Sequence, residues 1–186
     1  MNEVLRLQGL LLERSVKTGS FTLSSGATSS YYVDARRTTM TAEGQKLVGK
    51  VCYDRILEMK WRASHVGGLT LGADPVAYAI ACHSFEGPGP ILDGLTVRKE
   101  AKGHGTGRQV EGGAPAGARV VVLEDIVTTG KSAFLAIAAL EKAEMLVVGV
   151  LCLVDREEGG REKLEKAGLP FQAIFTKTQL LKEKIG

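Results

Sequence analysis

The sequence predicts an α/β fold in which a parallel sheet carries helices on both faces. Short apolar runs rich in β-branched residues recur along the chain, as in residues 119–124 (RVVVLE), and such runs are typical of strands buried on both faces of a sheet. Segments with apolar residues at helical spacing lie between them, as in residues 131–143. Strands that alternate with helices favour a doubly wound sheet, here within one domain of 186 residues.

The first forty residues are predicted to form a helix, a loop and a short strand. The opening stretch MNEVLRLQGLLLERS is interrupted by charges, so it is expected to be an amphipathic helix and not a signal peptide. Residues 19–36 are rich in small side chains and are predicted to be a loop that runs into a strand at Tyr31–Ala35. Thr41 then provides an N-cap for a helix whose apolar residues share one face.

The remaining elements follow at intervals typical of α/β proteins. Residues 64–85 predict a short strand, a glycine-rich turn and a helix that begins near Pro75. Residues 90–100 (PILDGLTVRKE) predict a strand that leads into a loop. After the strand at 119–124 and the helix at 131–143, we expect a strand at 146–154, a helix at 160–167, a strand at 171–175 and a short terminal helix.

Composition describes a soluble globular protein and argues against two other classes. No segment approaches the roughly 18 consecutive apolar residues of a membrane span. A net charge of +3 is too small to argue for nucleic-acid binding by itself. The three cysteines, Cys52, Cys82 and Cys152, lack metal-ligand spacing and are expected to be reduced core thiols of a cytoplasmic protein.

The first candidate site is the segment EDIVTTGKS, residues 124–132, between a predicted strand and a predicted helix. Its Gly-Lys-Ser ending is similar to a nucleotide-binding P-loop, but that loop needs a glycine where Asp125 stands. The segment lies at the carboxyl end of a strand, which is where open α/β sheets bind ligands. Free backbone N–H groups at the start of the helix favour an anion there.

The side chains of this segment predict a ligand with two different ends. Hydroxyls of Thr128, Thr129 and Ser132 add hydrogen-bond donors for an anion. Glu124 and Asp125 would repel a phosphate, but carboxylates accept hydrogen bonds from vicinal hydroxyls. A ribose 5-phosphate satisfies both halves, whereas the alternative is a solvated turn with an acidic cap.

Two stretches resemble a known enzyme family. Residues 121–133 resemble the phosphoribosyl pyrophosphate motif of the type I phosphoribosyltransferases, and residues 97–113 (VRKEAKGHGTGRQVEGG) resemble the mobile loop of the orotate-specific members. The resemblance implies a single domain over 1–186, with a small hood from about residues 1–40 and the C-terminal end, and a core of about 41–175. It also implies that phosphoribosyl pyrophosphate contacts Glu124, Asp125, Ile126, Val127, Thr128, Thr129, Gly130, Lys131 and Ser132.

The loop at 97–113 sets Arg98, Lys99, Lys102 and His104 among glycines. Cations there would neutralise a pyrophosphate leaving group, and glycines would let the loop close and exclude water. The alternative is a solvated, charged hairpin tip. The resemblance implies that Arg98, Lys99, Lys102 and His104 contact phosphoribosyl pyrophosphate. It implies Lys102, His104 and Asp125 as catalytic residues.

The glycine-rich turn at 67–74 precedes a helix, so its backbone N–H groups can bind a second anion. Such a turn is weak evidence alone, but beside the other motif it resembles the family's pyrophosphate loop. The resemblance implies contacts from Thr70, Leu71, Gly72 and Ala73. Many relatives have a lysine where Gly72 stands, so here backbone contacts must suffice.

Arg156 is the candidate for recognising the base, because it follows a strand at the carboxyl edge of the sheet. An arginine there can bind a planar carboxylate through two parallel hydrogen bonds. In the family, the arginine that matches Arg156 recognises the orotate carboxylate. The alternative is a surface salt bridge with Glu157 or Glu158.

The resemblance implies further orotate contacts from Tyr31, Tyr32 and Thr128. Tyr31 and Tyr32 match an aromatic pair that flanks the base in relatives. Ser24 and Ala27 stand where many relatives carry basic residues, so two cations of that subsite are missing here.

The resemblance implies transfer of the phosphoribosyl group from phosphoribosyl pyrophosphate to orotate, giving orotidine 5′-monophosphate and pyrophosphate in de novo pyrimidine (UMP) biosynthesis. It implies Mg²⁺ held mainly by substrate oxygens and water, since the sequence shows no all-protein cage. It implies a homodimer whose 97–113 loop closes over the partner's site, with no nucleic-acid or membrane partner. The alternatives are a purine phosphoribosyltransferase, which would lack the 97–113 loop and Arg156, and a regulatory protein that senses phosphoribosyl pyrophosphate.

Overall fold

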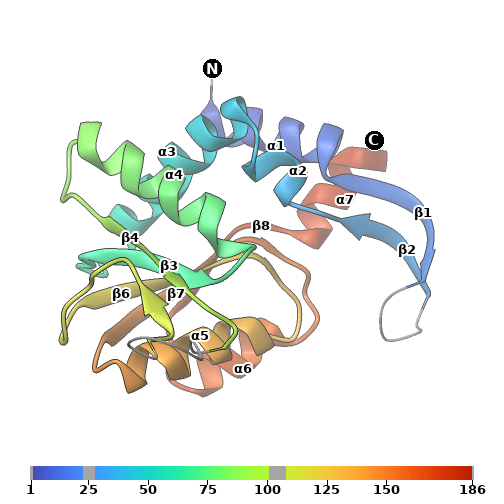
Figure 1. Cartoon of the computed structure of the whole chain (residues 1–186). Coiled ribbons are helices and arrows are strands. Elements are labelled where there is room, and N and C mark those ends of the chain that lie inside the picture. Colours follow the sequence, from blue (N-terminus) through green and yellow to red (C-terminus); the bar gives the residue numbers. More distant parts are fainter. Residues whose placement is uncertain (1, 23–27, 101–107, 186) are drawn as a thin grey trace.

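A six-stranded sheet forms the centre of the computed structural model, which describes residues 2–22, 28–100 and 108–185 (Figure 1). The strands lie in the order β5-β4-β3-β6-β7-β8, and all neighbours are parallel except β4 and β5. This confirms the predicted α/β class. The strands are β3 (His65–Leu69), β4 (Asp93–Val97), β5 (Val110–Glu111), β6 (Arg119–Val127), β7 (Leu146–Asp155) and β8 (Phe171–Thr176).

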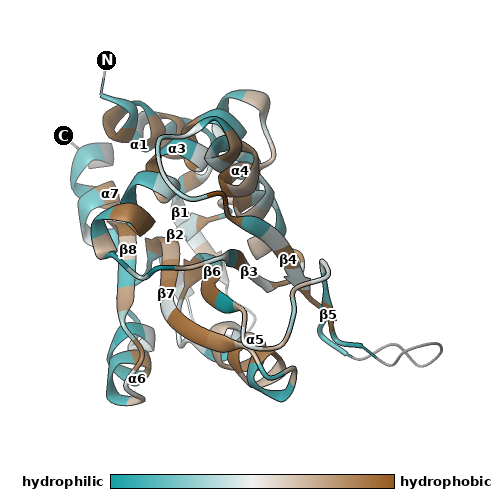
Figure 2. Ribbon diagram, turned by 90° about the vertical axis from the view of Figure 1, so that its left-hand side faces the viewer, coloured by the Kyte–Doolittle hydropathy of each residue, from teal (hydrophilic) through white to brown (hydrophobic). Residues whose placement is uncertain are grey.

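Helices cover both faces of the sheet, as the buried strands require. On one face lie α3 (Ala42–Met59) and α4 (Ala73–Glu86), and on the other lie α5 (Lys131–Lys142) and α6 (Gly160–Lys166) (Figure 1). The hydrophobic core therefore has two parts, one on each face of the sheet, and β6 contributes side chains to both. Its alternate residues Val121 and Leu123 pack with the first pair of helices, while Val120 and Val122 pack with the second. Figure 2 shows hydrophobic colouring on β7 and hydrophilic colouring on the outer helix α7.

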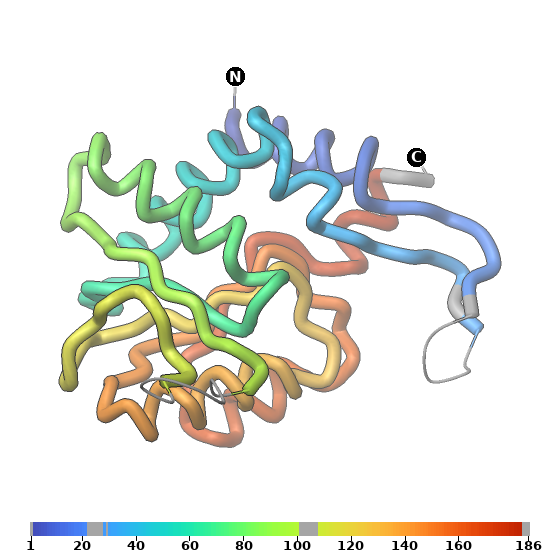
Figure 3. Tube along the Cα trace, viewed as in Figure 1, coloured from blue at the N-terminus to red at the C-terminus, as the bar shows by residue number. Residues whose placement is uncertain are grey.

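The N-terminal segment and the last helix gather at one side of the sheet, so that both chain ends lie on the same side of the molecule (Figure 3). The segment comprises α1 (Glu3–Arg14), β1 (Val16–Thr22), β2 (Thr28–Val33) and α2 (Arg36–Thr39), and the last helix is α7 (Lys177–Ile185). The predicted amphipathic helix is confirmed. The Asn2 side chain accepts a hydrogen bond from the Val4 N–H at 3.0 Å, and one face of α1 buries Leu7, Leu10 and Leu11.

The prediction of a loop over residues 19–36 was wrong in part. Residues 16–22 form β1, which pairs antiparallel with β2, and the second strand ends at Val33 rather than at Ala35. Few apolar residues mark these strands, because the hairpin is largely exposed. Its stability depends on cross-strand pairs such as Val16 with Val33.

The prediction that all three cysteines lie in the core was also wrong for Cys82. Cys52 and Cys152 are buried, but Cys82 is exposed on α4. That helix is apolar on more than one face, so periodicity did not indicate which side would be covered. Its outward side carries Tyr78, Cys82 and Phe85 at the spacing of one helical stripe.

No helix within the described ranges has the length and apolar character to span a bilayer.

Candidate active site

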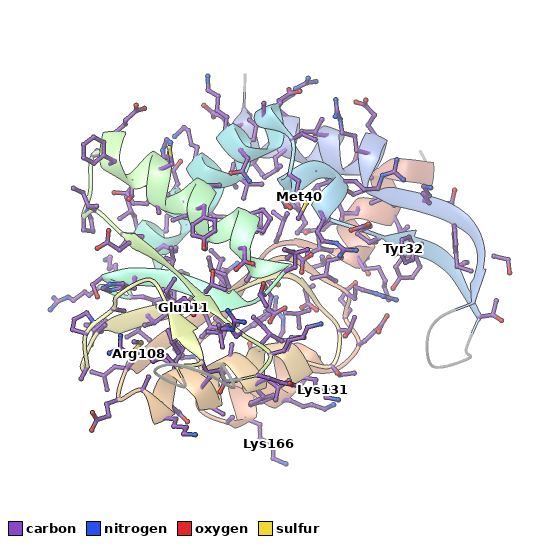
Figure 4. The ribbon with its side chains drawn as sticks, viewed as in Figure 1. Tyr32, Met40, Arg108, Glu111, Lys131 and Lys166 are labelled. Atoms are coloured by element: carbon purple, nitrogen blue, oxygen red, sulfur yellow. The ribbon has the colours of Figure 1, made fainter. Side chains whose placement is uncertain are left out.

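The carboxyl ends of β3 and β6 meet at a cavity of about 300 Å³. The turn after β3, the end of β6, the start of α5 and the segment that joins β2 to α2 form its walls. Tyr32 projects from β2 on one side, and Lys131 marks the start of α5 (Figure 4). The lining residues are Tyr32, Val33, Asp34, Arg36, Leu69, Thr70, Leu71, Gly72, Lys99, Glu124, Asp125, Ile126 and Ser132.

A larger cavity of about 570 Å³ lies elsewhere, between the turn after β5 and the C-terminal half of α5. Arg108, near β5 in Figure 4, contributes to its wall. Within the described part of the chain, none of its lining residues is acidic, and it lies away from the 124–132 segment. The smaller cavity has the carboxylates and the strand ends, so it is the better candidate for chemistry.

Glu124 and Asp125 end the buried part of β6 and face the smaller cavity. Glu124 is only 6% exposed, and its Oε1 has no hydrogen-bond partner among the residues described. Burial, followed by the charge of Asp125, raises the pKa of Glu124 to about 8. Burial also raises the pKa of Asp125, opposed by a 2.9 Å hydrogen bond from the Ile126 N–H and by the charge of Arg36. A buried carboxyl oxygen that has no hydrogen-bond partner fits a ligand that donates hydrogen bonds.

The turn after β3 approaches these carboxylates closely. A Cβ at Gly72 would lie 2.5 Å from Asp125 Oδ1, so any side chain there would require the carboxylate to move. Asp74 holds the turn in place, since its two oxygens accept hydrogen bonds from Thr70 Oγ1 at 2.7 Å and Thr96 Oγ1 at 2.8 Å. The Thr70–Leu71 peptide bond is cis.

The start of α5 lies beside the cavity and offers backbone donors. Gly130 is in the left-handed region with φ +79°, and no side chain of the described residues caps the helix. The turn packs against the loop after β7: a Cβ at Gly160 would lie 2.5 Å from the Thr128 carbonyl oxygen, and the Arg156 N–H donates to the Val127 carbonyl at 2.9 Å. The free N–H groups of such a helix start suit an anion.

Arg156 leaves the end of β7 and points toward the hairpin. Its side chain is 12% exposed; Nη2 lies 2.7 Å from Glu158 Oε1, and Nε donates to the Tyr31 hydroxyl at 3.2 Å. The alternative salt bridge with Glu158 is therefore present. Glu157 instead accepts hydrogen bonds from the backbone N–H and the hydroxyl of Thr178, at 2.8 and 2.6 Å.

The structure brings most of the predicted residues together. The cavity collects nine of them, and a small hollow beside it is lined by Val127, Thr128, Gly130 and Lys131, with Glu124, Ile126 and Ser132 shared. Arg98 is not among the lining residues and pairs with Glu111 at 3.7 Å. Lys102, His104, Ser24 and Ala27 lie outside the described residues. Ala73 is buried at the start of α4.

Two residues that sequence reasoning missed also line the cavity. Asp34 and Arg36 follow β2, and Arg36 Nε donates to Asp34 Oδ1 at 2.9 Å. The sequence feature that could have indicated these two residues was a pair of opposite charges, Asp34 and Arg36, directly after a strand. It carries little weight without knowledge that the hairpin lies over the carboxyl edge of the sheet.

The chain resembles known proteins along most of its length. Residues 43–180 match the family described as phosphoribosyl transferase domain. An orotate phosphoribosyltransferase of Aquifex aeolicus (strain VF5) is 49% identical over 179 residues, which cover 95% of this chain and 96% of that protein.

Two solved structures of Mycobacterium tuberculosis H37Rv orotate phosphoribosyltransferase are also similar. The complex with Fe(III) dicitrate has a TM-score of 0.84 and 42% identity, covering 96% of this chain and 98% of that one. The complex with 5-phospho-alpha-D-ribosyl 1-diphosphate (PRPP) has a TM-score of 0.80 and 38% identity, with the same coverage of both chains.

Proposed function

We propose, from the premise that this chain belongs to the phosphoribosyl transferase domain family, that it acts as an orotate phosphoribosyltransferase. It transfers the phosphoribosyl group of phosphoribosyl pyrophosphate to orotate in pyrimidine biosynthesis. Relatives named for this activity are similar over nearly the whole chain, and one solved relative holds phosphoribosyl pyrophosphate.

One observation in the site supports this function above the others. The buried, unpaired Oε1 of Glu124 lies beside Asp125, and the start of α5 next to them has no side-chain cap within the described residues. The carboxylates suit the vicinal hydroxyls of a ribose, and the helix start suits its 5′-phosphate. A sugar phosphate fits both, whereas a bare phosphate would be repelled by the acids.

The reaction needs positioning and charge neutralisation more than an activated nucleophile. Glu124 and Asp125 hold the ribose hydroxyls, residues 128–132 hold the 5′-phosphate, and the turn at 70–72 faces the pyrophosphate. Orotate N1 attacks C1 of the ribose and releases its proton to solvent, and pyrophosphate leaves with the electrons of the broken C1–O bond. Lys99 at the cavity wall, with Arg98, Lys102 and His104 of the same loop, would stabilise the charge that gathers on pyrophosphate.

The base is held at the other side of the sugar. Arg156 binds the orotate carboxylate, while Tyr31, Tyr32 and Thr128 flank the ring. We also propose that α1, the β1–β2 hairpin, α2 and α7 act as the hood over this site. A cytoplasmic location stays a prediction.

Magnesium fits this site as an ion bound largely by substrate. The described residues contain no group of three or more histidine, cysteine or acidic side chains that could enclose a metal. The orphaned oxygen of Glu124 and the neighbouring Asp125 carboxylate are suitable oxygen ligands, alone or through water. When bound, the ion would neutralise pyrophosphate charge, and Asp125 would orient it relative to the ribose.

A homodimer is supported by the exposed stripe of Tyr78, Cys82 and Phe85 on α4, which we call the α4 stripe. Tyr78 is 52% exposed and Phe85 76%. Exposed side chains of this size gathered in one region are typical of a contact surface. In such a dimer the 97–113 loop of one subunit would serve the partner's site.

The activity is tested directly by following the loss of orotate absorbance with phosphoribosyl pyrophosphate and magnesium. Adenine and hypoxanthine in place of orotate are the matched controls. Turnover of a purine base with none of orotate would contradict the proposal and favour the purine alternative.

Loop sharing is tested by mixing two inactive variants, Lys102→Ala and Asp125→Asn, and letting their subunits exchange. If the loop acts across the interface, each mixed dimer has one site with neither defect, and roughly a quarter of wild-type activity should return. Each variant exchanged with itself is the control. Confirmed exchange without recovered activity would show that the loop serves its own subunit.

A further inference from the structure

Three side chains form a closed ring of hydrogen bonds beside the proposed base site. Arg156 Nε donates to the Tyr31 hydroxyl at 3.2 Å, the Tyr31 hydroxyl donates to Glu158 Oε1 at 3.2 Å, and Arg156 Nη2 reaches the same oxygen at 2.7 Å. The guanidinium carbon also lies 5.1 Å from the centre of the Tyr31 ring. Tyr31 belongs to β2, whereas the other two follow β7, so the ring joins the hairpin to the sheet.

The ring uses only one edge of the guanidinium. An arginine presents two parallel N–H groups on its side edge, from Nε and Nη2, and two on its end edge, from Nη1 and Nη2. Tyr31 and Glu158 both lie on the side edge. No acceptor for Nη1 is found among the residues the structure describes, so a planar carboxylate can still bind the end edge.

Glu158 is therefore placed to orient Arg156 rather than to block it. Arg156 is 12% exposed and Glu158 is 36% exposed, so the arginine is the more constrained partner. An arginine side chain has many rotamers, and fixing it before the ligand arrives lowers the entropy lost on binding.

The backbone that carries Glu158 is itself fixed. The Glu157 N–H donates to Asp155 Oδ1 at 2.8 Å, and Asp155 Oδ2 pairs with Arg161 Nε at 3.1 Å. Glu157 turns the other way and accepts from Thr178. Of two adjacent carboxylates, only Glu158 contacts Arg156, which provides a matched control one residue away.

We propose that Glu158 is a positioning residue for orotate. Together with Tyr31 it holds the side edge of Arg156, so that the end edge is presented to the carboxylate of the base. This rests on the proposed function, because it takes orotate to be the ligand of Arg156. Glu158 itself does not contact substrate.

The test compares steady-state kinetics of Glu158→Ala, Glu158→Gln and Glu157→Ala, each first checked for a wild-type melting transition. Glu158→Ala should raise the orotate KM about fivefold, with kcat and the KM for phosphoribosyl pyrophosphate within about twofold of wild type. Glu158→Gln should restore most of the orotate KM, because its amide oxygen can still accept from Nη2 and from the Tyr31 hydroxyl. Glu157→Ala, which removes the same charge, should leave the orotate KM unchanged.

A lower orotate KM in Glu158→Ala would mean that Glu158 competes with orotate, and this would overturn the proposal. An unchanged KM, or an equal rise in Glu157→Ala, would also overturn it. In an Arg156→Ala background, Glu158→Ala should have no further effect on the orotate KM, because the residue acts only through Arg156.

The single variant Arg156→Ala distinguishes a failure of the positioning role of Glu158 from a failure of the proposed orotate binding by Arg156. If that variant keeps the wild-type orotate KM, the assignment of Arg156 to orotate fails and the positioning role falls with it. If Arg156→Ala raises the KM while Glu158→Ala does not, only the positioning role fails.

Discussion

The two ends of the proposed substrate site are built in different ways. The sugar–phosphate end comes mainly from one continuous stretch, residues 124–132, in which a strand ends and a helix begins. The base end is assembled from Tyr31, Arg156 and Glu158, and its hydrogen bonds join residues 125 and 127 positions apart.

The difference shows why a strand-to-helix turn is a dependable place for a phosphate. Local backbone geometry creates its donors, so they form together with the sheet and helix that flank them. The base end exists only if the hairpin docks correctly over the end of β7. We therefore expect changes at the first end to affect catalysis itself, and changes at the second to affect one substrate selectively.

The largest effect is expected at the sugar end. Asp125→Asn keeps the size of the side chain and removes its charge, so it should lower kcat by about 100-fold or more through poorer handling of ribose and magnesium. Turnover measured at saturating concentrations of both substrates checks this. Wild-type turnover would remove the central assignment of this motif.

At the base end, Arg156→Ala should raise the orotate KM by about tenfold or more, because a buried charge-assisted pair is worth ~2–3 kcal/mol. The KM for phosphoribosyl pyrophosphate should change little. Substrate titrations of each in turn provide the measurement. An equal rise in the KM of both substrates would contradict the view that the base end affects orotate binding selectively.

A smaller effect is expected where the turn after β3 meets the carboxylates. Gly72→Ala places a Cβ against Asp125 Oδ1, so the carboxylate must shift. The KM for phosphoribosyl pyrophosphate should rise about threefold to tenfold, with the orotate KM less affected. Gly9→Ala is a suitable control for added bulk, since Gly9 lies within helix α1 and a Cβ there would meet nothing within 4 Å. A Gly72→Ala enzyme with wild-type constants would show that the turn adapts freely.

The smallest effect is on stability. The pKa of Glu124 is raised from its ordinary 4.5 to about 8, so between these values the free folded protein keeps a proton that the unfolded chain has released. Stability contributed by this group is therefore lost as the pH rises from about 4.5 to about 8. Glu124→Gln should melt roughly 5 °C above wild type at pH 8 to 9 and much closer to it at pH 5. Parallel melting curves at all pH values would contradict the burial argument.

What could be predicted from the sequence follows the same division. The sugar–phosphate end is continuous in the chain: it consists of the run Val120–Leu123, the helix after Gly130 and the acids between them. Its chemistry could therefore be predicted from the sequence without knowledge of the fold. Tyr31 was selected by resemblance, and Arg156 both by its position after a strand and by resemblance. No pattern indicated that Tyr31 would bond to Arg156, or that Glu158 rather than Glu157 would join them. The hairpin strand at 16–22 was missed because it carries few apolar side chains and is largely exposed.

The bond between Glu157 and Thr178 sets a limit on how the protein can be engineered. It ties the first turn of α7, the last helix, to the residue that follows Arg156. A fusion partner or tag that pulls on this helix would weaken its docking, whereas an extension that leaves Thr178 seated should be tolerated. Deleting residues 177–185 would remove this bond together with the buried side chain of Leu180, so it should lower the stability of the fold.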